Sequence, residues 1–439
     1  MPTGSGKSLC YQLPALTLPG PGLAVVFSPL IALMEDQVAA LKRKGIRAEF
    51  INSTLERRER ERRYKAVASG EYELVYVTPE RMRKPDFVDA IRRVVGGIKL
   101  VAVDEAHCIA KWGHDFRPAY QEIGEFRRQL GSPLTVALTA TATAPVRADI
   151  RRTLGRDERE MPLFASGIDR PNLSFTVEEA WGGEGKIDTI CNIASQWRGT
   201  GIVYFTLVKS IEQAAQELRK KWGTKRMEIY HGQLPPTEKK RVYDRFAAAK
   251  PDDQLLLLAT NAFGMGVDKA DIRFIIHAQI PGSVEAYYQE VGRAGRDGEA
   301  SRCTLLYEEA DLAIQHQFVD WRNPGSAMLQ EAAHKFQSSP YADLSVDELR
   351  DQIIRRDRGD RRAEYCVTAL EKLGVIEQGS APDRYQFVRP LAEEEVDDSA
   401  LEEKKSRDLK RLLDMVNLVR SDDIRRFIID YFELGETVV

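Results

Sequence analysis

The sequence predicts an α/β fold with two tandem parallel-sheet domains and a smaller, mostly helical C-terminal region. Its 439 residues suffice for roughly three domains of about 150 residues each. Short β-branched runs alternate with charged segments of helix length, which is typical of βαβ units. This rhythm restarts after a stretch marked by proline and glycine, residues 162–185, and fades from about Asn323. We therefore expect domains over residues 1–165, 166–322 and 323–439.

The strands expected in the two sheets are short apolar runs. In the first domain they are residues 23–28, 73–78, 100–105 and 135–140, and in the second they are residues 201–205, 255–260, 273–277 and 303–307. In the third region, helical patterns at 345–357 and 360–373 precede a strand-like run at 384–390. Two helices followed by a hairpin indicate a winged-helix-like segment over 341–390, and apolar residues at helical spacing predict terminal helices over 401–432.

Composition excludes several classes of protein. Sixty-four basic residues against 67 acidic ones give a net charge of −3, so bulk charge identifies no partner, although a local basic patch could still bind phosphates. The longest apolar stretch, residues 22–34, is interrupted by Ser28 and Pro29 and is too short to span a bilayer. No signal peptide is recognisable at the N-terminus, which predicts a cytoplasmic protein. The five cysteines lie far apart without C-x2-C spacing, which argues against a disulfide framework or zinc ribbon; they are Cys10, Cys108, Cys191, Cys303 and Cys366.

Residues 3–8, TGSGKS, match the second half of a phosphate-binding loop. Glycines let backbone N–H groups point into one hollow around phosphates, while a lysine reaches the β/γ oxygens and a hydroxyl ligates magnesium. Met1 stands where the full pattern has glycine, so a simple glycine-rich turn remains an alternative. The candidate nucleotide-binding residues are Thr3, Gly4, Ser5, Gly6, Lys7 and Ser8, with Ser8 also a magnesium ligand.

Two carboxylates, Asp104 and Glu105, end an apolar strand at the edge where parallel sheets bind ligands. Asp104 would hold magnesium, and Glu105 would orient and deprotonate an attacking water. The alternative is a solvated strand end. A third group, Gln289, Arg293 and Arg296, lies in the second domain, where two arginines three apart would share one face of a helix. Guanidinium groups suit a transferring phosphoryl group, although basic helix faces are usually only solvated.

Taken in order, six segments resemble the motifs of a superfamily 2 helicase: TGSGKS, DEAH (104–107), ALTATAT (137–143), YHGQL (230–234), ATNAFGMGVDKADIRFIIH (259–277) and QEVGRAGRDG (289–298). Residues 1–16 and 107–120 narrow the resemblance to the RecQ family of ATP-dependent DNA helicases. The resemblance covers about residues 1–320. It implies two RecA-like domains that use ATP and Mg²⁺ to move 3′ to 5′ on single-stranded DNA and separate the strands.

The same resemblance assigns further roles. His107 would link the hydrolysis site to Gln289, and Asp268 would lie near the nucleotide or the domain interface. Short polar residues beside strand ends would contact the DNA backbone, although such residues also suit helix caps and turns. An aromatic-rich loop would stack on unpaired bases, unless it simply packs on its own domain. The residues expected at DNA are Ser28, Pro29, Leu30, Thr78, Arg81, Trp112, His114, Phe116, Arg117, Thr139 and Thr141, of which Thr139 and Thr141 would couple hydrolysis to domain movement.

The chain departs from the family pattern at both ends. The family has an adenine-reading motif and a strand before the phosphate loop, whereas nothing precedes Met1, so we expect a short first sheet. Residues 410–432 resemble the helical start of the family's zinc module, with Ile424 where its first cysteine would stand, so we expect no zinc. The winged-helix-like segment lies before these helices rather than after them.

We therefore expect an ATP-dependent DNA helicase of DNA repair or recombination. Its expected partners are ATP, Mg²⁺ and single-stranded or partly duplex DNA, and not a membrane; the resemblance also admits single-stranded-DNA-binding or repair proteins. If the protein is bacterial, it would be associated with the nucleoid. Two alternatives stay open: a DNA-stimulated ATPase that translocates without unwinding, and a catalytically inactive DNA-binding relative.

Overall fold

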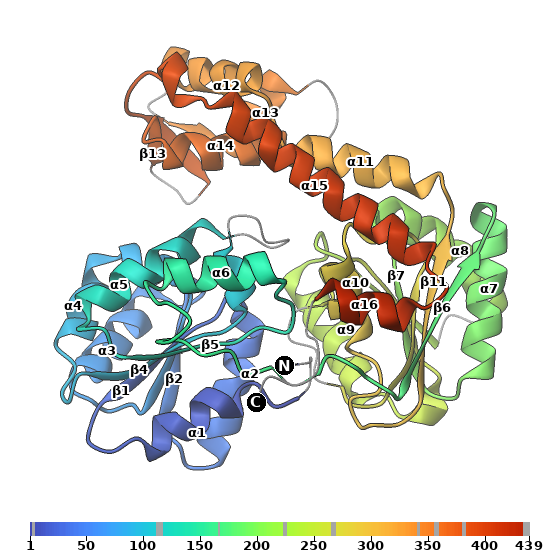
Figure 1. Cartoon of the computed structure of the whole chain (residues 1–439), viewed down its shortest axis with the longest axis horizontal. Coiled ribbons are helices and arrows are strands. Elements are labelled where there is room, and N and C mark those ends of the chain that lie inside the picture. Colours follow the sequence, from blue (N-terminus) through green and yellow to red (C-terminus); the bar gives the residue numbers. More distant parts are fainter. Residues whose placement is uncertain are drawn as a thin grey trace. The chain divides into compact units, whose positions relative to one another are not determined.

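The structure is a computed structural model that describes residues 1, 5–110, 117–165, 167–222, 226–264, 269–339, 343–354, 360–379 and 383–432 (Figure 1). It divides into two compact units. One comprises Met1–Glu308 and Leu418–Val439, and the other comprises Glu309–Asn417. Several predicted site residues lie outside the described residues, namely Thr3, Gly4, Trp112, His114, Phe116 and Asp268.

The first sheet has five parallel strands in the order β2-β3-β1-β4-β5. The strands are β1 (Leu23–Phe27), β2 (Ala48–Ile51), β3 (Leu74–Val77), β4 (Ile98–Val103) and β5 (Leu134–Ala137). The helices are α1 (Leu9–Thr17), α2 (Ile31–Arg43), α3 (Arg57–Ala68), α4 (Pro85–Arg92), α5 (Ile123–Gln129) and α6 (Ala144–Thr153). Every residue of β1 and β3 is buried, as expected where helices cover both faces of a parallel sheet.

Alternate residues of each central strand enter two separate cores. Val25 and Phe27 of β1 pack with side chains of α3, α4, α5 and α6, whereas Ala24 and Val26 pack with those of α1 and α2. This alternation follows from the two-residue period of a strand. The helices therefore flank the sheet on both sides, as Figure 1 shows for α1 and α6.

The second sheet has six strands in the order β6-β11-β10-β7-β9-β8, all parallel. They are β6 (Leu173–Glu179), β7 (Thr200–Tyr204), β8 (Met227–Tyr230), β9 (Leu256–Ala259), β10 (Ile272–His277) and β11 (Ser301–Tyr307). The helices are α7 (Gly182–Gln196), α8 (Val208–Trp222), α9 (Pro236–Ala248) and α10 (Val284–Val291). The predicted pair of parallel-sheet α/β domains is thus confirmed.

Three strands escaped the sequence prediction. Strands β2, β6 and β8 contain polar residues and are short or half-exposed, so they lack the continuous apolar runs of the central strands. Strand β6 also falls inside the proline- and glycine-marked stretch, residues 162–185, after which the sequence predicts that the strand rhythm restarts. It pairs with β11 at the edge of the second sheet, where one-sided pairing tolerates half-exposed residues.

The second unit contains the predicted helical region. Its elements are α11 (Asp311–Arg322), α12 (Ser326–Ser338), β12 (Leu344–Ser345), α13 (Val346–Ile353), α14 (Arg362–Lys372), β13 (Ile376–Gln378), β14 (Arg384–Phe387) and most of α15 (Asp398–Val419). The strands form an antiparallel sheet in the order β12-β14-β13, and α12, α13 and α14 pack around one apolar core with it. Ser345 and Glu348 form a capping box that starts α13. This order of helices and strands is winged-helix-like.

The last described helix, α16 (Ile424–Tyr431), belongs to the first unit and contacts β6. Ile424, which stands where the family's first zinc cysteine would be, is buried together with Ile428. Within the described ranges, no group of three or more histidine, cysteine, aspartate or glutamate side chains is arranged to hold a metal ion. None of the helices that the structure describes is long and apolar enough to cross a membrane.

Close packing in the second sheet yields a stability prediction. Gly201 of β7 lies opposite Phe274 of β10, and a Cβ atom at Gly201 would approach the Phe274 ring to 2.0 Å. Gly201→Ala should therefore lower the free energy of unfolding by about 1–3 kcal/mol. A lower midpoint of urea unfolding would measure this loss. The matched control is Gly185→Ala in α7, where no atom lies within 4 Å, and it should be neutral or stabilising. Equal midpoints for the two variants would contradict the prediction.

Candidate active site

The carboxyl ends of four adjacent strands bring together most of the polar residues singled out in the first domain. Ser28 follows β1, Thr78 follows β3, and Asp104 follows β4. Thr139 and Thr141 follow β5 at the same edge. In a parallel sheet this edge is where ligands bind, because the loops there leave the strands toward the same side.

A tight turn holds Asp104 and Glu105 directly after β4. The Asp104 backbone N–H donates to the Phe27 carbonyl at 2.8 Å, and the Glu105 N–H donates to Asp104 Oδ1 at 3.0 Å. Glu105 adopts a left-handed conformation with φ 48° and ψ 48°, which is uncommon for a residue with a side chain. The Tyr120 hydroxyl donates to the Asp104 carbonyl at 3.1 Å and supports the turn from the side. Backbone strain of this kind is concentrated at functional sites.

His107 connects this turn to the threonines after β5. Its side chain is 2% exposed, its Nδ1 lies 2.9 Å from Thr139 Oγ1, and the same nitrogen lies 3.3 Å from Glu105 Oε2. The Thr141 N–H in turn donates to Thr139 Oγ1 at 3.1 Å. A continuous polar chain therefore joins Glu105, His107, Thr139 and Thr141. The predicted link from His107 to Gln289 stays a prediction.

Lys7 and Ser8 lie at the start of α1, as the phosphate-loop pattern indicates. Gly6 has φ 82°, a conformation that glycine adopts without strain, and the Leu9 N–H donates to the Gly6 carbonyl at 2.9 Å as the helix begins. The Ser8 hydroxyl makes no capping hydrogen bond. Because N–H groups at a helix N-terminus favour anions, the start of α1 is suited to a phosphate group.

The charges of Lys7, Asp104 and Glu105 act on one another. Burial lowers the pKa of Lys7, while Glu105 and Asp104 oppose this shift and the positive charge of Arg296 adds to it. Burial and the negative charge of Glu105 raise the pKa of Asp104 to about 7. A buried carboxylate pair of this kind lacks a full complement of positive charge, which a cation could supply.

This site fits a nucleotide with magnesium. The two predicted magnesium ligands, Ser8 and Asp104, offer hard oxygen donors, which Mg²⁺ prefers, and few protein ligands suffice when phosphates and water supply the others. Lys7 and the N-terminus of α1 supply the complementary positive charge for phosphate.

The arginine-bearing motif requires a correction. Helix α10 ends at Val291, so Arg293 and Arg296 lie in turns beyond it and do not share a helical face as predicted. Gly295, with φ 52°, redirects the chain between them. Arg293 is 4% exposed and packs near Gly264, where an added Cβ would lie 3.0 Å from its Nη2 atom, whereas Arg296 is partly exposed. Gln289 is partly exposed on α10.

Most residues predicted to contact DNA are buried in this structure. Ser28, Thr78, Arg81 and Thr141 are each less than a tenth exposed. In the part of the chain that the structure describes, Ser28 Oγ, Arg81 Nε and Thr141 Oγ1 have no hydrogen-bond partner. Pro29 and Leu30 are buried as well, and Arg117 Nη1 donates to the Pro29 carbonyl at 3.3 Å. Two of the predicted DNA-contacting segments, 28–30 and the end of the aromatic-rich loop, are therefore adjacent.

Sequence reasoning missed several residues that support the site. Tyr120 carried no signal because a single buried tyrosine in a short 3-10 helix, Pro118–Glu122, has no characteristic spacing. Tyr204 ends β7, and burial raises the pKa of its phenol while the nearby charge of Arg293 opposes the rise. Arg170 and Asn172 flank Pro171 in the stretch marked by proline and glycine, residues 162–185. The sequence signal that could have identified them is an arginine and an asparagine on either side of a proline, directly before a strand.

Comparison with known proteins defines first the class and then the family. The DEAD/DEAH box helicase model matches residues 1–149, and the helicase conserved C-terminal domain model matches residues 185–298. The chain is 42% identical over 321 residues to the ATP-dependent DNA helicase RecQ of Bacillus subtilis, covering 73% of this chain and 52% of that protein. It is 37% identical over 368 residues to the probable ATP-dependent DNA helicase RecS of the same organism, covering 84% of this chain and 71% of that protein.

Solved structures agree with this class at the level of the fold. The DUF1998 helicase MrfA bound to DNA matches with a TM-score of 0.54 and 20% identity, covering 90% of this chain and 55% of that chain. Dbp5 of S. cerevisiae bound to RNA and ADP BeF3 matches with a TM-score of 0.53 and 18% identity, covering 72% of this chain and 80% of that chain. The protein thus has the two-domain fold of helicases. With the sequence matches, the chain belongs to the RecQ family of DNA helicases, and it spans about half the length of the RecQ relatives it matches.

The raised pKa of Asp104 predicts an unusual pH dependence of stability. Because the folded chain holds this proton more tightly than the unfolded chain, ionisation of Asp104 increasingly opposes folding as pH rises from about 4 to about 7. In the absence of nucleotide and magnesium, Asp104→Asn should therefore raise the thermal midpoint of unfolding more at pH 8 than at pH 5. Asp252→Asn on the exposed surface is the control and should show no such difference. A pH-independent effect of Asp104→Asn would refute the assignment.

Proposed function

We propose that this protein is an ATP-dependent DNA helicase that moves 3′ to 5′ on single-stranded DNA and separates duplex strands. The observation that carries the proposal is that Lys7 of the phosphate loop lies close enough to Asp104, Glu105 and Arg296 for their charges to act on its pKa, so a phosphate loop, a carboxylate pair and an arginine from the second α/β domain meet at one place. Relatives that cover most of this chain are described as ATP-dependent DNA helicases. A role in DNA repair or recombination follows by family analogy.

In the proposed reaction, the loop formed by Thr3, Gly4, Ser5 and Gly6 surrounds the phosphates of ATP, and Lys7 contacts their β/γ oxygens. Ser8 and Asp104 would hold Mg²⁺, which neutralises negative charge on the phosphate oxygens when bound. Glu105 orients the attacking water and accepts its proton. His107, whose Nδ1 lies 3.3 Å from Glu105 Oε2, would restrain the carboxylate.

Arg296 and Arg293 stabilise the negative charge that spreads over the transferring phosphoryl group, a role that is worth about 10³–10⁵-fold in related enzymes. Because Arg293 is buried against its own domain, we assign the direct contact to Arg296 and the support of the loop to Arg293. Gln289 would complete the nucleotide-facing residues of the second domain, and Asp268 would lie near the nucleotide or the domain interface. The chain Glu105–His107–Thr139–Thr141 would transmit the state of the nucleotide to the DNA-binding edge.

On the DNA side, the proposed contacts are the backbone around Ser28, Pro29 and Leu30 and the side chains of Thr78 and Arg81. The aromatic-rich loop, with Trp112, His114, Phe116 and Arg117, would stack on unpaired bases at about 1–3 kcal/mol per base. The contact of Arg117 with Pro29 supports a shared role of these segments. We propose the domain limits 1–165, 166–322 and 323–439, and we propose that the winged-helix-like segment 341–390 serves as an accessory module. Zinc is not expected to take part.

The first test is ATP hydrolysis by the full chain with and without single-stranded DNA. Turnover should rise with DNA, and Lys7→Ala should abolish it. Glu105→Gln should retain ATP binding but lower kcat about 10²–10⁴-fold, because it removes the general base while keeping the shape of the side chain. Strand displacement on a duplex with a single-stranded tail is measured in parallel. Hydrolysis without displacement would indicate a translocase, and DNA binding without hydrolysis would overturn the proposed activity.

A further inference from the structure

The turn that carries Arg296 is held by the segment that leads into β6. Arg170 donates to three carbonyl groups of this turn through its guanidinium. The Nη1 atom donates to the Gly292 carbonyl at 3.4 Å, and the Nη2 atom donates to the carbonyls of Ala294 at 2.9 Å and Gly295 at 2.7 Å. Carbonyl groups that follow the end of a helix lack partners within the helix, so the planar fork of an arginine satisfies several of them at once.

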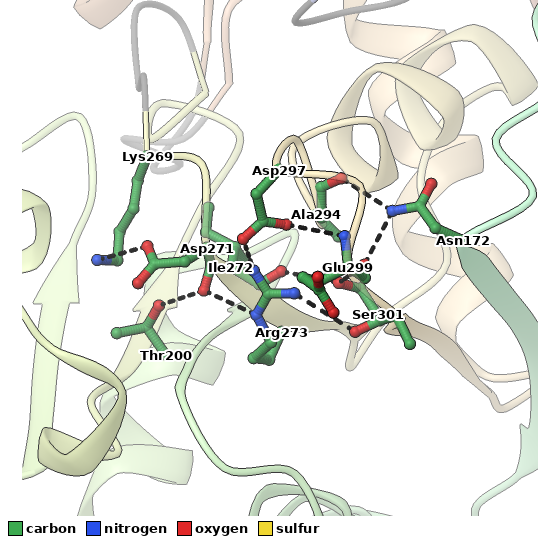
Figure 2. Close-up of polar contacts among 12 residues, drawn as sticks. Asn172, Thr200, Lys269, Asp271, Ile272, Arg273, Ala294, Asp297, Glu299 and Ser301 are labelled. Carbon is green, nitrogen blue, oxygen red and sulfur yellow. Dashed lines mark hydrogen bonds and ion pairs between the residues drawn. The ribbon is translucent and has the colours of Figure 1, made fainter.

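Asn172 holds the same turn from the next position along the segment. Its side-chain Nδ2 donates to the Gly295 carbonyl at 2.8 Å and to the Glu299 carbonyl at 2.9 Å. The backbone carbonyl of Asn172 accepts from the Ser301 N–H at 2.9 Å. Figure 2 shows Asn172 facing the residues that surround this turn. The fit is close, because a Cβ atom at Gly295 would lie 2.5 Å from Asn172 Nδ2.

Strand β10 holds the turn on its other side. The Gly295 N–H donates to the Ile272 carbonyl at 2.9 Å, and Ser301 Oγ donates to the same carbonyl at 3.1 Å. Arg273 forms an ion pair with Asp297, the residue after Arg296 (Figure 2). The backbone on both sides of Arg296 is therefore tied to β10 and to the 170–172 segment.

Helix α16 braces the 170–172 segment in turn. Arg425 donates to the Arg170 carbonyl at 3.0 Å, pairs with Asp169, and also donates to the Leu173 carbonyl. Its guanidinium lies 5.4 Å from the centroid of the Phe175 ring. The Tyr288 hydroxyl of α10 donates to the Ile168 carbonyl at 2.7 Å, so the segment is held from both sides.

We propose that Arg170 and Asn172 are positioning residues for ATP hydrolysis: they fix the turn 292–299 so that Arg296 is presented in one orientation, and Arg425 of α16 stabilises them. This inference rests on the proposed function, since it needs Arg296 to act on the nucleotide. Neither Arg170 nor Asn172 touches the reacting atoms. Their effect should therefore appear in kcat and depend on the presence of Arg296.

The decisive experiment is a double-mutant cycle of Arg170→Ala and Arg296→Ala, with DNA-stimulated ATP turnover as the readout. Arg170→Ala should lower kcat about 10–100-fold, because small displacements of an acting group have effects of that size, while KM for ATP changes less than about 2-fold. In the Arg296→Ala background, Arg170→Ala should have almost no further effect. Guanidinium ion added to Arg170→Ala should restore part of the turnover.

Two further variants keep the test decisive if Arg170→Ala fails to fold, which is checked by its thermal midpoint. Asn172→Ala removes two hydrogen bonds to the turn, and Arg425→Ala removes the support from α16; both should lower kcat in the same direction and lose this effect without Arg296. Arg198→Ala is the matched control, since Arg198 forms an exposed ion pair with Asp252 in the same domain. It should retain wild-type kcat.

Two results would overturn the inference while leaving the proposed function intact. One is a folded Arg170→Ala protein with wild-type kcat. The other is a double mutant whose loss of kcat equals the product of the losses in the two single mutants. Such independent effects would mean that Arg170 supports the fold in general and does not act through Arg296. Absence of turnover in the wild-type chain would overturn the proposed function and this inference together.

Discussion

A pair of neighbouring carboxylates, the buried Asp104 and the partly buried Glu105, is the constraint on which the first domain depends. Two negative charges at the end of a buried strand oppose folding unless positive charge or ligand lies opposite them. Three groups lie close to these carboxylates: Lys7 at the start of α1, the Glu105 N–H that donates to Asp104, and His107 beside Glu105. The free energy of folding that is still lost to these negative charges is typical of a site that binds a ligand, where stability is not maximal.

The same constraint explains why the polar chain through His107 matters. Because His107 is almost fully buried, its ring needs partners inside the domain, and it finds them in Glu105 and Thr139. His107 thereby links Glu105 to Thr139, the first of the two threonines after β5. Those threonines share the sheet edge with Ser28 and Thr78, where several polar atoms have no partner within the described residues. The site and the proposed DNA-contacting residues thus lie at the same edge of one sheet.

In the second domain, the main structural constraint is the conformation of the turn 292–299 and not the burial of charge. Once α10 has ended, several carbonyl groups need donors and Gly295 must turn the chain. Arg170 and Asn172 meet these requirements from a segment more than a hundred residues earlier in the chain. Helix α16, from the end of the described chain, holds that segment. Residues distant in sequence thereby determine one short functional turn.

The sequence by itself determined the class of fold, the central strands and most of the candidate site. Fully buried parallel strands must be continuous apolar runs, and phosphate and carboxylate chemistry needs fixed residue types at short spacing, so both leave local patterns. The sequence did not show that Arg293 and Arg296 lie beyond the helix in different environments, nor that Arg170, Asn172 and Arg425 hold their turn. Only the tertiary structure decided these points, because the hydrogen bonds concerned run from these side chains to backbone carbonyls of segments far apart in the chain, and a backbone carbonyl has no side-chain signature in the sequence.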